Sequence, residues 1–177
     1  MNDKKIAFII AVNNEQYFEE CCFYIHRLSV PAGYDIDIIA IREADSMCAA
    51  YNVGMNNSDA KYKVYMHQDV MIRNVQFIEN IIKIFKQNLK VGMIGMIGGT
   101  CMPETGVIYR AWDIGMVDCR DSDMAYYLEG QQNMPKKDVI VEAVDGLLMA
   151  TQYDITWRED LFTHFDFYDV SQSCEMR

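Results

Sequence analysis

The chain has 177 residues, of which 51% are hydrophobic and 24% are charged, and such a composition is typical of one globular domain with its own core. Its formal net charge is -10 at pH 7, which argues against nucleic-acid binding because no net positive field exists to attract phosphates. The same charge makes a naked anionic ligand costly to bind, so a nucleotide would need a divalent cation as a bridge. No apolar run is long enough to span a membrane.

Strand and helix patterns alternate along the first hundred residues. Short apolar runs predict strands over residues 6–12, 34–41, 61–66 and 91–97. Apolar residues at helical spacing predict helices over residues 15–28, 45–56 and 74–89. Asn13 with Gln16 forms a predicted capping box for the first helix, and Asn74 is the predicted cap of the third. This order predicts an α/β fold, with a mostly parallel central sheet between helices on both faces.

The pattern loosens after Gly98-Gly99. Residues 100–137 are interpreted as a long functional loop region of the same domain. Residues 139–151 are again typical of a strand, broken at Asp145-Gly146, and residues 167–177 are typical of a helix. We therefore expect a single domain over residues 1–177.

Targeting and redox signals are weak. The apolar run 6–12 follows two lysines, but it is seven residues long and lacks a small-residue cleavage site, so a buried strand is favoured over a signal peptide. The six cysteines form no C-x-x-C pair. We expect reduced, mostly buried thiols in a cytosolic protein.

Two acidic residues are candidates for chemistry. Asp69 follows the strand-like segment 64–68, and the carboxyl ends of strands are where α/β folds bind ligands. Asp169 begins the C-terminal helix. An acid that holds a metal and a separate base are what sugar transfer from a nucleotide donor requires. A strand-end turn and a helix cap explain the same two residues equally well.

Five segments in order carry a family resemblance. They are Val12-Asn-Asn-Glu15, Tyr51-Asn-Val-Gly54, His67-Gln-Asp69, Val144-Asp-Gly146 and Tyr168-Asp-Val-Ser-Gln-Ser173. Together they resemble the GT-A glycosyltransferases, specifically the family-2-like nucleotide-diphospho-sugar transferases, over most of residues 6–177. The resemblance implies a GT-A, Rossmann-like three-layer sandwich.

The resemblance implies a metal site after the third strand. In the family an Asp-x-Asp motif there binds a divalent cation on the donor diphosphate. Asp69 matches the last acid of that motif, and His67 replaces the first. We therefore expect Asp69 and His67 to hold Mn²⁺ or Mg²⁺, although a carboxylate suits these ions better than imidazole does. A satisfied histidine at a strand end is the alternative for His67.

The resemblance also implies residues for the two substrates. The donor-binding residues would be Asn13, Glu15, Glu43, Asn52, Gln68 and Asp69. Those on the acceptor side would be Trp112, Asp145 and Gly146, and Tyr126 and Tyr127 could stack on sugar faces beside Trp112. For Glu43 and its neighbour Asp45 a solvated acid is the alternative, and for Asp145-Gly146 a tight turn.

The implied reaction is an inverting, metal-dependent transfer of the hexosyltransferase type. Asp169 matches the catalytic base, which would take the proton of the acceptor hydroxyl as that oxygen attacks the anomeric carbon. A glycan or lipid-linked acceptor, surface polysaccharide assembly and a location in the cytoplasm or at the inner face of the membrane are expected from the family. The family continues past the position of Arg177, so a C-terminally shortened domain or a fragment is expected.

Two other classes compete with this hypothesis. A non-catalytic module of the same fold that binds a nucleotide-sugar or glycan is favoured by the His67 substitution. A dinucleotide-binding enzyme would need G-x-G-x-x-G after the first strand, where this chain has Val12-Asn-Asn-Glu15.

Overall fold

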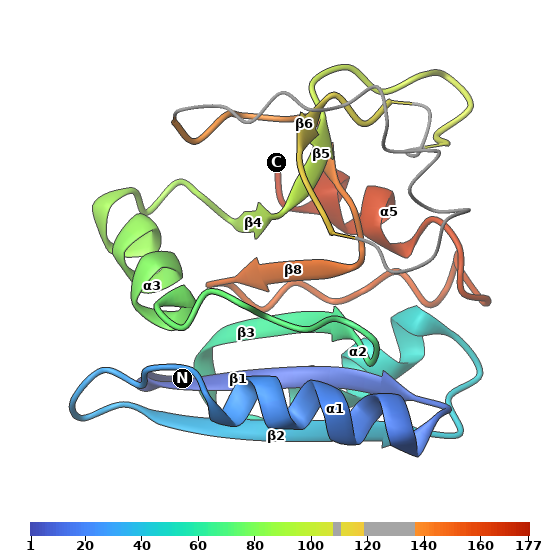
Figure 1. The fold of residues 1–177 in the computed structure, drawn as a ribbon. Coiled ribbons are helices and arrows are strands. Elements are labelled where there is room, and N and C mark those ends of the chain that lie inside the picture. The colour runs from blue at the N-terminus through green and yellow to red at the C-terminus, as the bar shows by residue number, and fades with distance from the viewer. Residues whose placement is uncertain (108–110, 119–136) are drawn as a thin grey trace.

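The computed structural model describes residues 1–107, 111–118 and 137–177 (Figure 1). The helices are α1 (Glu15–His26), α2 (Met47–Asn56), α3 (Phe77–Gln87) and α5 (Tyr168–Glu175). The strands of the main sheet are β1 (Asn2–Val12), β2 (Asp35–Arg42), β3 (Ala60–His67), β4 (Met93–Gly95) and β8 (Leu148–Thr151). A smaller sheet contains β5 (Ile97–Gly99), β6 (Ile114–Gly115) and β7 (Ala143–Val144).

The main sheet has the order β2-β1-β3-β8-β4. Parallel pairing joins β1 to β2 and to β3, whereas β8 runs antiparallel to both of its neighbours. The expected α/β fold is confirmed, but the sheet is only partly parallel. The carboxyl ends of β2, β1 and β3 lie side by side, because parallel strands end at one edge of a sheet.

Side chains that alternate along β1 build two separate cores. Ile6, Phe8 and Ile10 pack on one face with α1 and α3, while Ala7 and Ile9 pack on the other with α2 and Tyr168 of α5. The period-two alternation of a strand produces this division. Figure 1 shows α1 and α2 on opposite sides of the sheet, which gives the three-layer arrangement expected from the sequence.

The strand predicted over residues 91–97 is wrong in its extent, because the chain changes sheets there. β4 pairs with β8 in the main sheet, and after Met96 the chain enters β5 of the small sheet. Glycines permit this crossing: a Cβ on Gly95 would lie 2.4 Å from Val144 Cβ, and one on Gly98 would lie 2.8 Å from the Ala143 carbonyl oxygen. The break predicted at Asp145-Gly146 is confirmed as the connection between β7 and β8.

The predicted caps of two helices are wrong. The cap of α1 is Asn14, whose side chain accepts hydrogen bonds from the backbone N–H groups of Gln16 and Tyr17, rather than Asn13. Asn74 does not cap α3, which begins at Phe77; its side chain instead accepts from Gln76 N in the preceding turn.

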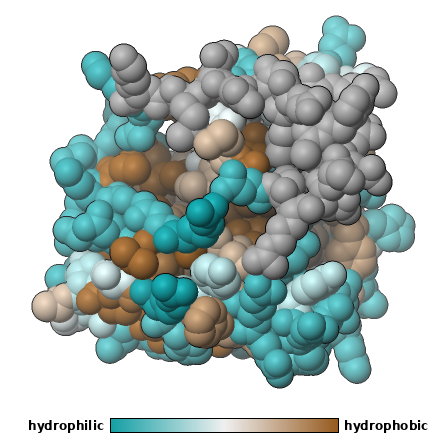
Figure 2. Space-filling model, in the orientation of Figure 1, coloured by the Kyte–Doolittle hydropathy of each residue, from teal (hydrophilic) through white to brown (hydrophobic). Residues whose placement is uncertain are grey.

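The face of the molecule drawn in Figure 2 carries both hydrophobic and hydrophilic residues. Figure 2 shows hydrophobic patches divided by hydrophilic residues across the face that carries α1. Within the described ranges, no helix is both long enough and apolar enough to cross a membrane. Tyr126 and Tyr127, proposed as sugar-stacking residues, lie outside the described residues.

An ion pair with a buried lysine joins β3 to the segment after β8. The Lys63 side chain is fully buried, and its Nζ donates to Asp154 Oδ1 at 2.8 Å, Asp154 Oδ2 at 2.9 Å and the Ala60 carbonyl at 2.6 Å. A charge removed from water needs such partners, because its desolvation is otherwise uncompensated.

We predict that Asp154→Ala lowers the free energy of unfolding by about 3 kcal/mol, because it leaves the Lys63 ammonium buried and unpaired. Urea denaturation measures the change. Lys63→Met is the matched control and should cost clearly less, since it removes the buried charge and leaves Asp154, about a third exposed, in contact with water. An equal loss in the two variants would contradict this explanation.

Candidate functional site

A pocket of about 270 Å³ lies at the shared carboxyl edge of β1, β2 and β3. Its lining residues come from the ends of all three strands, the loop into α2 and the segment before α5. They are Ala11, Val12, Asn13, Ile41, Glu43, Ala44, Met47, His67, Gln68, Asp69 and Phe165. This edge of an α/β sheet is the usual location of a ligand site.

Gln68 connects the loops that follow β1 and β3. Its Oε1 accepts from Asn13 N at 3.0 Å and Asn14 N at 2.9 Å, and its Nε2 donates to Asn13 Oδ1. The two predicted donor residues Asn13 and Gln68 therefore both line the pocket and bond to each other. These bonds fix the shape of the pocket wall.

The acidic residues after β1 and β2 have different surroundings. Glu15 forms a bidentate ion pair with Arg42, at 2.7 and 2.9 Å, and it does not line the pocket. These hydrogen bonds from Arg42 lower the pKa of the Glu15 carboxyl. Glu43 lines the pocket in a left-handed conformation with φ of 56°, which is uncommon for a residue other than glycine. Asp45 is exposed and lies outside the lining.

Asp69 and His67 both line the pocket, but their side chains are differently engaged. Asp69 is exposed. The His67 ring is half-buried, and its Nε2 lies 2.6 Å from the Tyr168 hydroxyl of α5. Burial lowers the pKa of His67, opposed by the charges of Asp69 and Asp169. The charges of both acids thus raise the pKa of the same imidazole.

Tyr168 is held in place by packing as well as by His67. Its ring belongs to the core cluster and lies 5.8 Å from the ring of Tyr51 and 6.3 Å from that of Trp157, measured between centroids. A Cβ on Gly146 would lie 2.1 Å from the Tyr168 hydroxyl oxygen. Only glycine therefore fits at position 146, which explains part of the Val144-Asp-Gly146 pattern through packing.

Asp169 is 7% exposed and does not line the pocket. Its Oδ2 accepts from Gly146 N at 3.0 Å, and its Oδ1 accepts from Val170 N at 2.8 Å. Burial raises the pKa of Asp169, against the lowering effect of these backbone N–H groups. Because each carboxylate oxygen accepts one N–H bond, each keeps a lone pair for a further donor.

Asp145 lies beside this group. Its Oδ1 accepts from Leu147 N at 2.9 Å, and burial raises its pKa to about 6, with a smaller raising contribution from the charge of Asp169. Two neighbouring acids with raised pKa values are characteristic of functional sites as well as of buried turns.

Two further predicted site residues, Asn52 and Trp112, also lie outside the pocket lining. The amide of Asn52 in α2 bonds to the Trp157 backbone through both of its atoms, at 3.0 and 2.9 Å. Gly54 faces Ile9, whose Cγ2 would be 2.2 Å from an added Cβ. Trp112 is buried in a small cluster with Ile97. The structure does not bring Asn52 or Trp112 into the pocket.

Two residues of the site were not singled out from the sequence. The sequence indicates Tyr168 only as part of the segment 168–173, and it indicates no role for Phe165. Their relation to His67 and to the pocket depends on contacts across about a hundred residues of chain. For Tyr168 the sequence offers one local signal, which is an aromatic residue directly before the acidic Asp169.

Comparison with protein-family models matches residues 7–177 to the glycosyltransferase-like family described as "Glycosyltransferase like family". The chain belongs to this family, and the expected resemblance to family-2-like GT-A glycosyltransferases is confirmed. Comparison with curated protein sequences gives no match.

The raised pKa of Asp145 predicts a pH dependence of stability. Between about pH 4 and pH 6 the native state binds more protons than the unfolded chain, so stability falls as the pH rises. Above pH 6 the ionised carboxylate should cost about 2–3 kcal/mol. Asp145→Asn keeps an oxygen that accepts from Leu147 N, but its amide cannot ionise. The variant should therefore be more stable than the wild type at pH 7.5, where the carboxylate is charged, but not at pH 4.

Chemical denaturation at the two pH values measures this difference. Asp45→Asn, which changes an exposed acid outside the pocket, is the control and should follow the wild type at both. A constant offset between Asp145→Asn and the wild type would show that Asp145 titrates normally.

Proposed function

We propose that this chain is an inverting glycosyltransferase that moves a sugar from a nucleotide-diphospho-sugar to an acceptor hydroxyl. The observation that supports this proposal most is the pocket at the carboxyl edge of β1, β2 and β3, which the exposed Asp69 lines. The chain that forms this pocket belongs to the glycosyltransferase-like family. Family membership alone supports a transferase with a sugar donor and an acceptor, whereas the donor class and the stereochemistry are parts of the proposal.

A divalent cation, Mn²⁺ or Mg²⁺, fits the pocket through Asp69. Among the described residues no group of three or more His, Cys, Asp or Glu side chains could hold a metal. One carboxylate is nevertheless a suitable protein ligand for a cation that takes its other ligands from a diphosphate and water. When bound, the cation neutralises charge that develops on the departing diphosphate.

His67 is a poorer candidate ligand than Asp69. Its Nε2 already lies at hydrogen-bond distance from the Tyr168 hydroxyl, so ligation by that nitrogen would break a part-buried bond. We propose that Asp69 is the main protein ligand and that His67 chiefly fixes the start of α5.

Asp169 is the proposed general base. In the transfer step the acceptor oxygen forms a bond to the anomeric carbon, the bond from that carbon to the diphosphate oxygen breaks, and the hydroxyl proton passes to the Asp169 carboxylate. Its raised pKa and remaining lone pairs support this role. Gly146 N, which holds Oδ2, orients the carboxylate.

A second candidate is a module of the same fold that binds a nucleotide-sugar without transferring it. The low exposure of Asp169 and its position outside the pocket lining favour this candidate. Donor hydrolysis or transfer in the presence of Mn²⁺ would distinguish the enzyme from the module.

The biological setting that we propose goes beyond the family membership. We propose a hexosyl donor, a glycan or lipid-linked acceptor and a role in surface polysaccharide assembly. A cytoplasmic location, including the inner face of the membrane, is consistent with the cysteines of the described ranges, which are all free thiols.

We predict that Asp69→Ala weakens Mn²⁺-dependent binding of a nucleoside diphosphate by more than about 10-fold, the loss typical even of an indirect metal partner. Because Asp69 is exposed, the melting temperature should not change. Isothermal calorimetry measures the affinity, with Asp45→Ala as the control, and His67→Ala should weaken binding less. Unchanged affinity in Asp69→Ala would show that Asp69 is only a turn residue.

We predict that Asp169→Asn reduces transfer by roughly 10²–10⁴-fold, the usual contribution of a general base. Donor affinity should hardly change, because the base acts on the acceptor. Asp166→Asn, which alters an exposed acid of the same segment, is the control. Turnover, donor affinity and melting temperature are measured for each variant. Full activity in Asp169→Asn would rule out the proposed base.

A further inference from the structure

Phe165 is an aromatic residue of the pocket with no role so far. It is 55% exposed. Among the exposed large apolar side chains of residues 1–107, 111–118 and 137–177, it is the one that lines the pocket. An aromatic ring that borders a pocket while half of it contacts water can gain apolar contact when a ligand binds.

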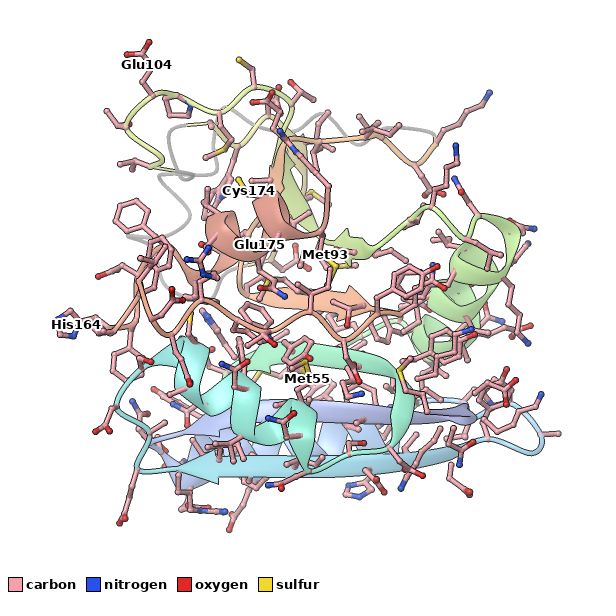
Figure 3. All side chains as sticks on the ribbon, turned by 180° about the vertical axis from the view of Figure 1, so that it is seen from behind. Met55, Met93, Glu104, His164, Cys174 and Glu175 are labelled. Atoms are coloured by element: carbon pink, nitrogen blue, oxygen red, sulfur yellow. The ribbon has the colours of Figure 1, made fainter. Side chains whose placement is uncertain are left out.

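The backbone on both sides of Phe165 is anchored. The carbonyl oxygen of His164 accepts from Met47 N at 3.2 Å, and Met47 itself lines the pocket. Figure 3 shows His164 at the edge of the molecule where the chain turns from β2 toward α2. On the other side, the Tyr168 hydroxyl lies 2.6 Å from His67. The phenyl ring is therefore carried by a segment fixed to two walls of the pocket.

The other lining residues suit a flat heterocycle with polar edges. Ala11, Val12 and Ile41 provide apolar surface, and the carboxylate of Glu43 can accept from N–H or O–H groups. Asp69 lies in the same pocket, where a cation-bound diphosphate would be held. A volume of about 270 Å³ is below the usual range for a drug-sized ligand, so it suits a nucleoside better than an entire nucleotide-sugar.

We infer that Phe165 is the base-stacking residue of this site, and that its ring covers one face of the donor nucleobase. Glu43 accepts a hydrogen bond from the base or the ribose. The inference deepens the proposed function and rests on it, since it assumes that the pocket takes a nucleoside diphosphate.

The position of Phe165 has a consequence for the reaction. It lies four residues before Asp169, on the segment that leads into α5. A nucleobase stacked on Phe165 would stabilise the segment that also carries Asp169, the proposed general base. Donor binding and activation of the acceptor hydroxyl are therefore joined through a short stretch of backbone.

The test compares nucleoside diphosphates with a ligand that has no base. Calorimetry in Mn²⁺ gives Kd for UDP, GDP, CDP, ADP and inorganic pyrophosphate with the wild type, Phe165→Ala, Phe165→Tyr and the control Leu161→Ala. Leu161 is 61% exposed on the same segment and does not line the pocket. Circular dichroism and melting temperature verify that each variant is folded.

We expect Phe165→Ala to raise Kd of the tightest nucleoside diphosphate by about 5- to 150-fold, the loss of one base–aromatic stack. Kd for pyrophosphate should not change, and Phe165→Tyr and Leu161→Ala should bind like the wild type. Phe165→Trp should add fluorescence that the nucleoside diphosphate quenches and pyrophosphate does not.

Three outcomes would overturn the inference. Unchanged nucleotide affinity in Phe165→Ala, or an equal loss for pyrophosphate, would refute stacking while leaving the proposed function intact. If the wild type binds pyrophosphate but binds no nucleoside diphosphate more tightly, both the stacking and the nucleotide donor are refuted.

Discussion

The hydrogen bond between His67 and Tyr168 is the constraint on which the arrangement of the site depends. It joins the end of β3 to the start of α5 across 101 positions of sequence, at 2.6 Å. Tyr168 cannot shift freely, because Tyr51 and Trp157 pack against its ring and Gly146 leaves room for the hydroxyl and no more. The distance between the β3 end of the pocket and Asp169 is therefore set by core packing, which is stiffer than a loop.

Several acidic side chains lie near this hydrogen bond. Asp69, Asp145 and Asp169 lie on neighbouring segments of a chain whose net charge is -10, and both Asp69 and Asp169 act on His67. Burial raises the pKa of Asp145 and of Asp169, so the ionised forms of these two carboxyls cost stability near neutral pH. Retaining such a cost is typical of a functional site, and a cation held by Asp69 would reduce it when donor is bound.

The sequence predicted most of the fold because apolar periodicity decides local structure. Ile6 to Val12 and the stripe in α3 required no long-range information. The apolar run at residues 91–97 predicts one strand, but the chain changes from the main sheet to the small sheet at Met96. Glycines permit this change, which depends on tertiary contacts that the local pattern does not contain. Site prediction had the same limit. Asp69 could be placed from its strand end, whereas the engagement of Asn52 with Trp157 and the approach of Phe165 to the pocket depend on contacts between distant segments.

We propose above all that the pocket at the carboxyl edge of β1, β2 and β3 holds the nucleotide donor. A crystal structure with a nucleoside diphosphate and Mn²⁺, located by its anomalous signal, tests this most directly. We expect the metal and the diphosphate beside Asp69, with the nucleobase against Phe165. Nucleotide bound instead in the separate hollow between Tyr34 and α3, with this pocket empty, would contradict it.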